Sequence, residues 1–212
     1  MGNRSVGDKG GFDKMVREIM FPVYPLLAAD FMQKSGITEG TCLDIGAGNG
    51  YLGLALAEKS NLRVHLVDPD PDILKLARVN IGERRLEGRV GTVVAGAGAL
   101  PFPDNYARLI VSRGSVFFWE NKVEDFNEIY RVLAPGGWTF IGGGFATPQL
   151  MADIVAKMKT KNPHFDKFVE KNIGPGAPER FHEVLRKSKV PESEAGVSYD
   201  SANLWVIMRK GD

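Results

Sequence analysis

Short apolar runs alternate with segments of helical periodicity through the middle of the chain. The runs that are short enough for buried strands lie at residues 41–45, 63–67, 90–94, 109–112 and 138–142. The segments that carry one apolar helical face lie at residues 51–59, 71–82 and 122–133. Strands and helices that alternate in this way are typical of a doubly wound parallel sheet. We therefore predict an α/β fold with helices on both faces of the sheet.

The N-terminal segment is helical but interrupted. Residues 12–34 have helical periodicity that is broken by Pro22 and Pro25. A proline inside a helix removes a backbone donor and kinks or ends the helix, so two short helices with a kink near Tyr24 are expected. Residues 1–11 are polar and glycine-rich, and we expect them to form a mobile tail.

The C-terminal part of the chain contains a longer helical stretch and then two strands. Residues 148–189 have a helical pattern that is interrupted at Pro163 and at residues 174–176. Residues 192–197 and 204–209 have the pattern of two strands joined by a turn. At 212 residues, the whole chain (residues 1–212) is expected to form a single domain with a sizeable core.

Composition and charge exclude several classes of partner. The net charge of +1 provides no overall field that would recruit nucleic acid or an anionic membrane. Cys42 is the single cysteine, so no internal disulfide forms, and a reducing, cytoplasmic location is the simplest expectation. No apolar run reaches the roughly 18 residues that a membrane span requires. His164 and His182 lack the spacing of metal ligands, so no metal is expected. We expect a monomer or a homodimer.

The most specific local pattern is LDIGAGNGY at residues 43–51, a buried strand that runs into a glycine-rich turn. Gly46 and Gly48 allow a sharp bend and let a ligand lie against the main chain. Asp68 follows at the end of the second predicted strand, about 20 residues later, where an acid binds a ribose diol in nucleotide-binding folds. The alternative role of Asp68 is the N-cap of the next helix. Together these features indicate a ligand that contains a nucleoside.

A dinucleotide is one candidate for this ligand. Residues 48–53 match the pattern G-x-G-x-x-G, which would make the protein an NAD-dependent reductase. The match begins late, four residues after Asp44, and no Tyr-x-x-x-Lys pair accompanies it. A lone match of this kind is weak evidence.

Four blocks of the sequence resemble the class I S-adenosylmethionine-dependent methyltransferases. Residues 44–50, with the form D-x-G-x-G-x-G, resemble motif I, and VDPD at 67–70 resembles motif II. ALPFPDN at 99–105 is similar to the loop before strand four in the small-molecule branch. EIYRVLAPGG at 128–137 is similar to the helix and turn before strand five. The blocks occur in the family's order over about residues 41–145.

This resemblance implies a fold and an activity. The fold is a seven-stranded, mostly parallel sheet with a C-terminal antiparallel strand pair. The activity is methyl transfer from S-adenosylmethionine to a small-molecule acceptor, with release of S-adenosylhomocysteine. Gly96 stands where the family usually has an acid that contacts the adenine, and residues 107–108 read Ala-Arg instead of Phe-Asp. The first departure leaves a second hypothesis open, a non-catalytic partner or regulatory protein of the same fold that binds the cofactor.

The resemblance also implies where the cofactor lies. Asp44 is expected to orient the ammonium of the methionine part, or else to tie down the amides of the turn. Asp68 is expected to accept hydrogen bonds from the ribose. The residues expected to contact the cofactor are Asp44, Gly46, Ala47, Gly48, Asn49, Asp68, Pro69, Ala97, Gly98, Ser112 and Arg113.

The candidates for the acceptor side are Arg113, Tyr24 and Trp119. Arg113 follows strand four and is suited to a bidentate grip on a carboxylate, or else it pairs with Glu120 or Asp44. Trp119 belongs to an aromatic run, residues 117–119, that either shapes a pocket or packs in the core. Tyr24 lies in residues 12–34, the expected helical lid, and residues 148–189 are expected to cover the substrate side. No catalytic base is assigned.

Overall fold

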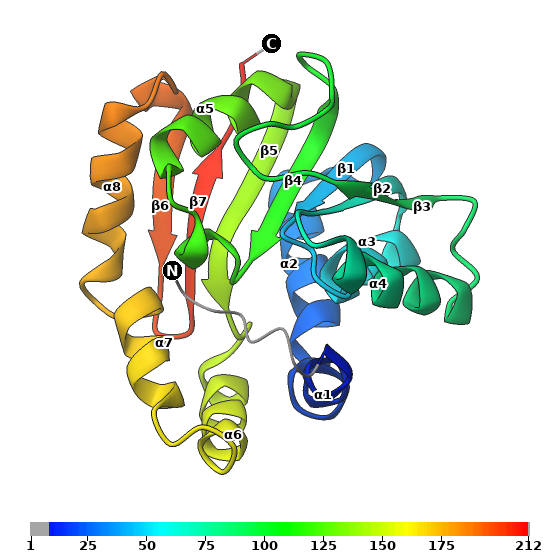
Figure 1. Cartoon of the computed structure of the whole chain (residues 1–212). Coiled ribbons are helices and arrows are strands. Elements are labelled where there is room, and N and C mark those ends of the chain that lie inside the picture. Colours follow the sequence, from blue (N-terminus) through cyan, green and yellow to red (C-terminus); the bar gives the residue numbers. More distant parts are fainter. Residues whose placement is uncertain (1–8, 212) are drawn as a thin grey trace.

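The computed structural model describes residues 9–211, and it contains a seven-stranded sheet (Figure 1). The strands are β1 (Glu39–Ile45), β2 (Asn61–Asp68), β3 (Val90–Val94), β4 (Ala107–Arg113), β5 (Leu133–Gly144), β6 (Ala195–Tyr199) and β7 (Asn203–Met208). Their order is β3-β2-β1-β4-β5-β7-β6, and β7 runs antiparallel to both of its neighbours. The predicted doubly wound sheet and its C-terminal antiparallel pair are therefore confirmed.

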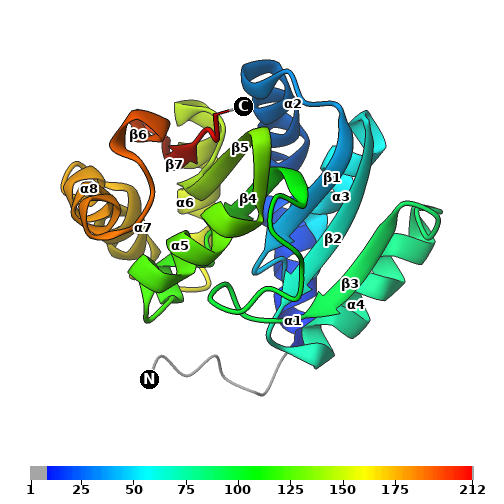
Figure 2. The ribbon, with the colours of Figure 1, turned by 90° about the horizontal axis from the view of Figure 1, so that it is seen from above.

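Helices cover both faces of the sheet, as Figure 2 shows from above. One face carries α2 (Val23–Ser35), α3 (Tyr51–Lys59) and α4 (Pro71–Glu83). The opposite face carries α5 (Lys122–Val132), α7 (Phe165–Ile173) and α8 (Ala177–Lys187). Three further segments lie beyond the carboxyl ends of the parallel strands, at the lower edge of Figure 1: α1 (Lys9–Met15), the π-helix η1 (Val16–Met20) and α6 (Pro148–Lys159). Within residues 9–211, no helix is long and apolar enough to cross a membrane.

An aromatic cluster fastens α2 to the sheet. The ring of Phe31 stacks on Phe140 of β5 at 4.3 Å and meets Trp205 of β7 edge-on at 4.9 Å. All three side chains are almost completely buried. Since a buried phenylalanine contributes roughly 1.5–3 kcal/mol, this contact holds the second half of the predicted lid segment in the core. Of the predicted lid segment, α1 and η1, which precede α2 in the sequence, are the part that lies over the carboxyl ends of the strands.

The break in the N-terminal helices differs from the prediction. The sequence predicted a kink near Tyr24, but α2 already begins at Val23, after a turn at residues 21–22. Pro25 lies in the first helical turn, where a backbone N–H has no intrahelical partner in any case. It is therefore accommodated without a kink. Residues 9–11 of the predicted mobile tail form the start of α1, and residues 1–8 lie outside the described part of the chain.

The C-terminal strands also differ from the prediction in their bounds. Strand β5 begins at Leu133, which pairs with Ala107, and the register shifts before the next pair, Leu109 with Trp138. The turn expected before residue 138 lies inside the strand, where the N–H of Gly136 donates to the carbonyl of Lys210. The predicted strand 192–197 begins as a 3-10 turn, η3 (Glu192–Glu194), and becomes a strand only at Ala195.

The strand order reverses between β1 and β4, and this reversal locates the site. β1 and β4 are adjacent, with Asp44 opposite Val111, but their connections leave in opposite directions to β2 and β5. Ligands of open α/β sheets bind outside the carboxyl ends of the strands at such a switch point. The glycine-rich turn follows β1, and the segment around Arg113 ends β4, so both lie at this point.

Candidate functional site

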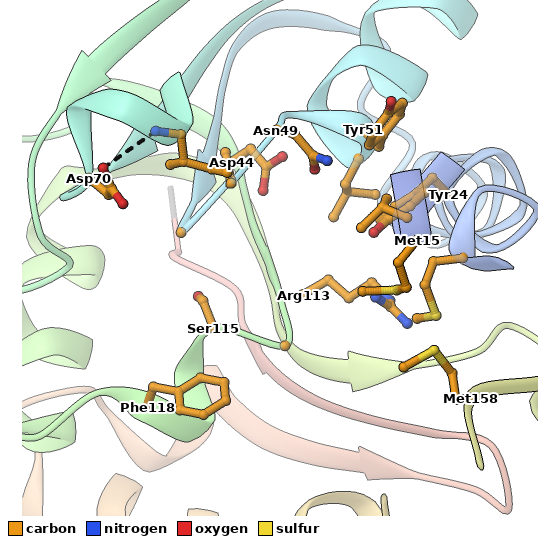
Figure 3. Close-up of a pocket in the computed structure, with 18 of the residues that line it drawn as sticks. Met15, Tyr24, Asp44, Asn49, Tyr51, Asp70, Arg113, Ser115, Phe118 and Met158 are labelled. Atoms are coloured by element: carbon orange, nitrogen blue, oxygen red, sulfur yellow. Dashed lines mark hydrogen bonds between the residues drawn. The ribbon is translucent and has the colours of Figure 1, made fainter. Parts of the chain in front are cut away.

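A cavity of about 490 Å³ opens at the switch point (Figure 3). Its floor contains the turn after β1 and the end of β4, including Asp44, Gly48 and Arg113. Its roof comes from segments far apart in the sequence, α1 with η1 on one side and α6 with α7 on the other. This volume lies within the range of small-molecule and cofactor sites.

The glycine-rich turn is closely packed on one side and open on the other. Gly46, Gly48 and Gly50 all have positive φ, between 57° and 87°. A Cβ on Gly46 would lie 2.3 Å from the side chain of Ser115, and one on Gly50 would lie 2.5 Å from Leu66. A Cβ on Gly48 would meet nothing within 4 Å. The turn is therefore packed closely against β2 and against Ser115, which follows β4, while the backbone at Gly48 remains open and forms a cradle.

Asp68 holds this turn in place. It is completely buried, and its two carboxylate oxygens accept backbone N–H groups from Gly48 at 2.9 Å and from Asp70 at 3.0 Å. Asp68 is not among the residues that line the cavity, whereas Asp70 is. The alternative reading of Asp68 as a helix cap is wrong, since the side chain of Asp70 caps α4 by accepting from the amides of Asp72 and Ile73.

Asp44 lines the cavity with a buried carboxyl group. Its Oδ2 accepts the backbone N–H of Gly53 at 2.9 Å, so it ties β1 to the start of α3 and not to the amides of the turn. Burial raises the pKa of Asp44 to about 7, against the lowering effect of the Gly53 hydrogen bond, and nearby Asp68 raises it further. The carboxyl group of Asp44 therefore changes from neutral to negatively charged as the pH rises through about 7, beside the open backbone at Gly48.

Two serines join the ends of β1 and β4. Ser112 and Ser115 share a hydrogen bond of 2.6 Å between their hydroxyl oxygens, and Ser115 donates to the carbonyl of Ile45 at 3.0 Å. Both are buried, but only Ser115 lines the cavity. Sequence reasoning named Ser112 for the site and missed Ser115. The tight approach of Gly46 to Ser115 explains why the second serine is the one at the cavity wall.

Arg113 reaches into the cavity between two aromatic rings. Its Nε donates to the carbonyl of Gly144 at 2.9 Å, and its guanidinium carbon lies 5.3 Å from the ring centre of Tyr24 and 5.5 Å from that of Phe145. Burial lowers the pKa of Arg113 and raises that of Tyr24. The predicted pairing with Glu120 or Asp44 is absent from the ion pairs among residues 9–211.

The aromatic run after β4 divides between the cavity and the core. Phe118 lines the cavity and keeps about half of its surface exposed. Phe117 packs toward Phe181, and Trp119 lies edge-on to Phe126 at 6.2 Å. Trp119, one of the acceptor-side candidates, is therefore placed outside the cavity lining, while Tyr24 and Arg113 belong to it.

The roof is apolar and is built from methionines and phenylalanines. The ring of Phe118 stacks on Phe168 at 6.1 Å, and Phe168 stacks in turn on Phe165. Between the two sides of the roof, Lys161 and Glu18 form an ion pair of 3.9 Å. The roof residues that line the cavity are Met15, Val16, Met20, Met158, Phe165 and Phe168. No local sequence signal marks them, because their proximity arises from packing between distant segments.

A polar cluster attaches the first roof segment to the turn. Asp13 of α1 accepts a hydrogen bond from the side chain of Asn49 at 2.8 Å and one from Arg17 at 2.7 Å. Asn80 donates to the carbonyl of Asn49 at 2.9 Å and accepts from Arg17. Burial raises the pKa of Asp13, but the bonds from Arg17 and Asn49 outweigh it, so the pKa lies below its ordinary value. The turn is thus joined by hydrogen bonds to the α1 and η1 side of the roof.

Pro69, Ala97 and Gly98, which were also predicted to contact the cofactor, are not among the residues that line the cavity. Pro69 and Gly98 are exposed, and Ala97 is buried. A Cβ on Gly98 would come within 2.7 Å of Asp125 Oδ1, so this loop lies against the start of α5. Gly96, where the family has an acid, is exposed, and a Cβ there would meet nothing within 4 Å. Among residues 9–211, no group of three side chains is placed to hold a metal ion.

Comparison with known proteins agrees with this architecture. Residues 43–141 match a family model described as a methyltransferase domain. The crystal structure of a candidate S-adenosyl-L-methionine-dependent methyltransferase from Methanococcus maripaludis superimposes with a TM-score of 0.92 at 39% identity, over 96% of this chain and 92% of that chain. A ubiquinone/menaquinone biosynthesis C-methyltransferase from Hydrogenovibrio crunogenus is 31% identical over 131 residues, which cover 60% of this chain. The chain spans about half the length of this relative, 52%.

The protein has a Rossmann-like fold. Proteins of this class bind a nucleoside-containing cofactor at the switch point of the sheet. The chain belongs to the class I S-adenosylmethionine-dependent methyltransferases. The cofactor of this class is S-adenosylmethionine, and this assignment replaces the reductase hypothesis. The cavity fits such a group, because Gly48 leaves a cradle that any Cβ would begin to fill and the carboxyl of Asp44 lies beside it.

Proposed function

We propose that this protein transfers a methyl group from S-adenosylmethionine to a small-molecule acceptor and releases S-adenosylhomocysteine. The observation that carries the proposal is the roofed cavity, which the open cradle at Gly48 and the end of β4 both line. A roof made by α1, η1, α6 and α7 leaves room for a small acceptor beside the cofactor. The relative from Hydrogenovibrio crunogenus, by its name, methylates a carbon atom in quinone biosynthesis, which supports an acceptor of this size.

The chain's own residues divide the work of binding. The backbone of residues 46–49 holds the methionine part, with Asp44 directed at its ammonium. Asp68 keeps Gly48 in position, and either Asp68 or Asp70, whose backbone it binds, receives the ribose hydroxyls. Pro69, Ala97 and Gly98 flank the adenine, in the role that the family resemblance gives them. Ser112 supports this arrangement through Ser115.

The reaction needs alignment and the exclusion of water more than it needs a strong acid or base. The electron pair of the acceptor atom forms a bond to the methyl carbon that the cofactor supplies on its positively charged sulfur, while the carbon–sulfur bond breaks and its pair remains on sulfur. The apolar roof excludes water from this space, which also strengthens the electrostatic contacts inside it. No residue of the cavity is assigned as a base.

The direct test uses methyl-labelled S-adenosylmethionine and a small-molecule extract, with the label followed by mass spectrometry. We expect label in a discrete metabolite. The matched control is Gly48→Ala, whose Cβ would enter the cradle and meet nothing else within 4 Å. It should strongly reduce the labelled product, and circular dichroism should show that the strain at its φ of +57° leaves the fold intact. If the wild-type protein binds the cofactor but labels nothing in extracts from several sources, the second hypothesis, a non-catalytic cofactor-binding partner or regulatory protein, replaces this one.

A further inference from the structure

Arg113 lines the cavity and lacks the carboxylate partner that four other arginines of the described chain have. Arg17, Arg84, Arg131 and Arg186 each form an ion pair with a carboxylate at 3.0 Å or less. Arg113 forms none, although it is only partly exposed and lines the cavity at the carboxyl end of β4. Because a cation that is partly shielded from water gains from a paired anion, this position suits an anion from outside the chain.

The contacts of Arg113 hold its guanidinium without neutralising it. Nε donates to the carbonyl of Gly144, and the guanidinium lies over the rings of Tyr24 and Phe145. The guanidinium also shares a hydrogen bond with the side chain of Tyr24, which is a neutral partner. The nearby acid of the cavity, Asp44, turns instead to the amide of Gly53. Figure 3 shows Arg113 directed toward the methionine side of the cavity, near Met15 and Met158, and away from Asp70. The fork of Arg113 is thus pre-oriented toward the apolar half of the space.

We propose that Arg113 binds a carboxylate carried by the methyl acceptor, so that the acceptor is an apolar or aromatic acid. The surroundings specify both parts of such a molecule. The planar guanidinium matches a carboxylate with two parallel hydrogen bonds. The hydrocarbon part of this acid would contact apolar side chains that line the cavity, those of Met15, Met158, Phe118 and Phe168. The inference rests on the proposed function, since it assigns the acceptor side of the same cavity.

The cofactor has a carboxylate of its own, so the experiment must separate the two sources. Three acids serve as probes, 4-phenylbutanoate, indole-3-acetate and decanoate, each paired with its primary amide. Binding of each is measured by calorimetry to the protein saturated with S-adenosylhomocysteine. We expect the wild-type protein to bind at least one acid tenfold or more above its amide, since hydrogen bonds to charged groups are the stronger ones.

Two variants complete the test. Arg113→Gln should bring the ratio of acid to amide affinity close to one and leave the affinity for S-adenosylhomocysteine within about threefold. Phe168→Ala, the matched control, should weaken acid and amide alike and preserve their ratio. Arg113→Lys keeps the charge without the fork and should give an intermediate ratio.

Two results would overturn the proposal. One is the absence of an acid preference in all three pairs with the wild-type protein. The other is a loss of tenfold or more in affinity for S-adenosylhomocysteine in Arg113→Gln with the acid preference intact, which would assign Arg113 to the cofactor. If the wild-type protein does not bind S-adenosylhomocysteine, the proposed function is contradicted. The role of Arg113 is then decided separately, by measuring the acid and amide pairs on the unliganded protein.

Discussion

The floor and the roof of the cavity are built on different principles. The floor, around Gly46 and Asp68, consists of backbone in fixed conformations whose hydrogen bonds are satisfied within the fold. The roof, around Met158 and Phe168, consists of flexible or partly exposed apolar side chains from distant segments. A floor of this kind suits a ligand that is always the same, and a roof of this kind adapts to a particular acceptor. The difference predicts that substitutions in the two regions will change different measurements.

The largest effect is expected in the floor, from Gly46→Ala. The new Cβ would lie 2.3 Å from Ser115 at a φ of +67°. Left-handed strain costs roughly 1–2 kcal/mol, and overpacking adds roughly 1–3 kcal/mol. The matched control is Gly36→Ala, which has a similar φ of +70° but nothing within 4 Å. Urea denaturation should show the larger loss for Gly46→Ala, and equal losses would mean that the turn is not seated against Ser115.

Asp68→Ala should weaken binding of S-adenosylmethionine by on the order of tenfold or more. The substitution removes the acceptor for the amides of Gly48 and Asp70 together with any bond to the ribose. Asp70→Asn separates these roles, because it removes the charge of the residue at the cavity while its side-chain oxygen can still cap α4. Calorimetry on both variants decides which acid receives the ribose. Unchanged affinity in Asp68→Ala would place the ribose elsewhere.

Cofactor binding should depend on pH through Asp44. The pKa of Asp44 is raised to about 7, so its carboxylate is mostly protonated at pH 6 and mostly ionised at pH 7.5. If the ionised form holds the ammonium, affinity should fall on the order of tenfold from pH 7.5 to pH 6. For the unliganded protein the sign is opposite: a raised carboxyl pKa costs stability as pH rises from about 4 to about 7. Asp44→Asn should flatten both profiles, and an unaltered binding profile in that variant would exclude this role.

The smallest effect on the cofactor is expected in the roof, from Phe168→Ala. This ring is 38% exposed and stacks on Phe118, so its removal should change stability by less than about 1 kcal/mol. Affinity for S-adenosylhomocysteine should stay within about twofold, while KM for the acceptor rises. Steady-state kinetics with the labelled metabolite test this expectation. A large loss of cofactor affinity would show that roof and floor do not serve separate ligands.

The same contrast explains how much the sequence could predict. The strands, the helix at residues 51–59 and the turn of Gly46 and Gly48 follow from local periodicity and glycine chemistry, and the structure has them. The break between the N-terminal helices was predicted near Tyr24 but lies at residues 21–22, because a proline in the first turn of a helix is indistinguishable, from sequence, from one that breaks it. The start of β5 at Leu133 depends on its partner in β4.

The candidate site was predictable in part of its floor and not in its roof. Arg113 and Tyr24 were predicted as acceptor-side residues, and the structure brings them together at 5.3 Å. Ser115, Met158 and Phe168 were missed, because each reaches the cavity through contacts between segments that are distant in the sequence. Their positions depend on the register of β4 against β1 and on the packing of α6 and α7, which no local pattern encodes.

The most direct measurement is a crystal structure of the complex with S-adenosylhomocysteine. The account predicts the methionine part against the backbone of residues 46–49, its ammonium beside Asp44, and the ribose hydroxyls within hydrogen-bonding distance of Asp68 or Asp70. It also predicts that the guanidinium of Arg113 remains unoccupied by the cofactor and faces the space under the apolar roof. A ligand bound away from the glycine-rich turn would contradict the central claim.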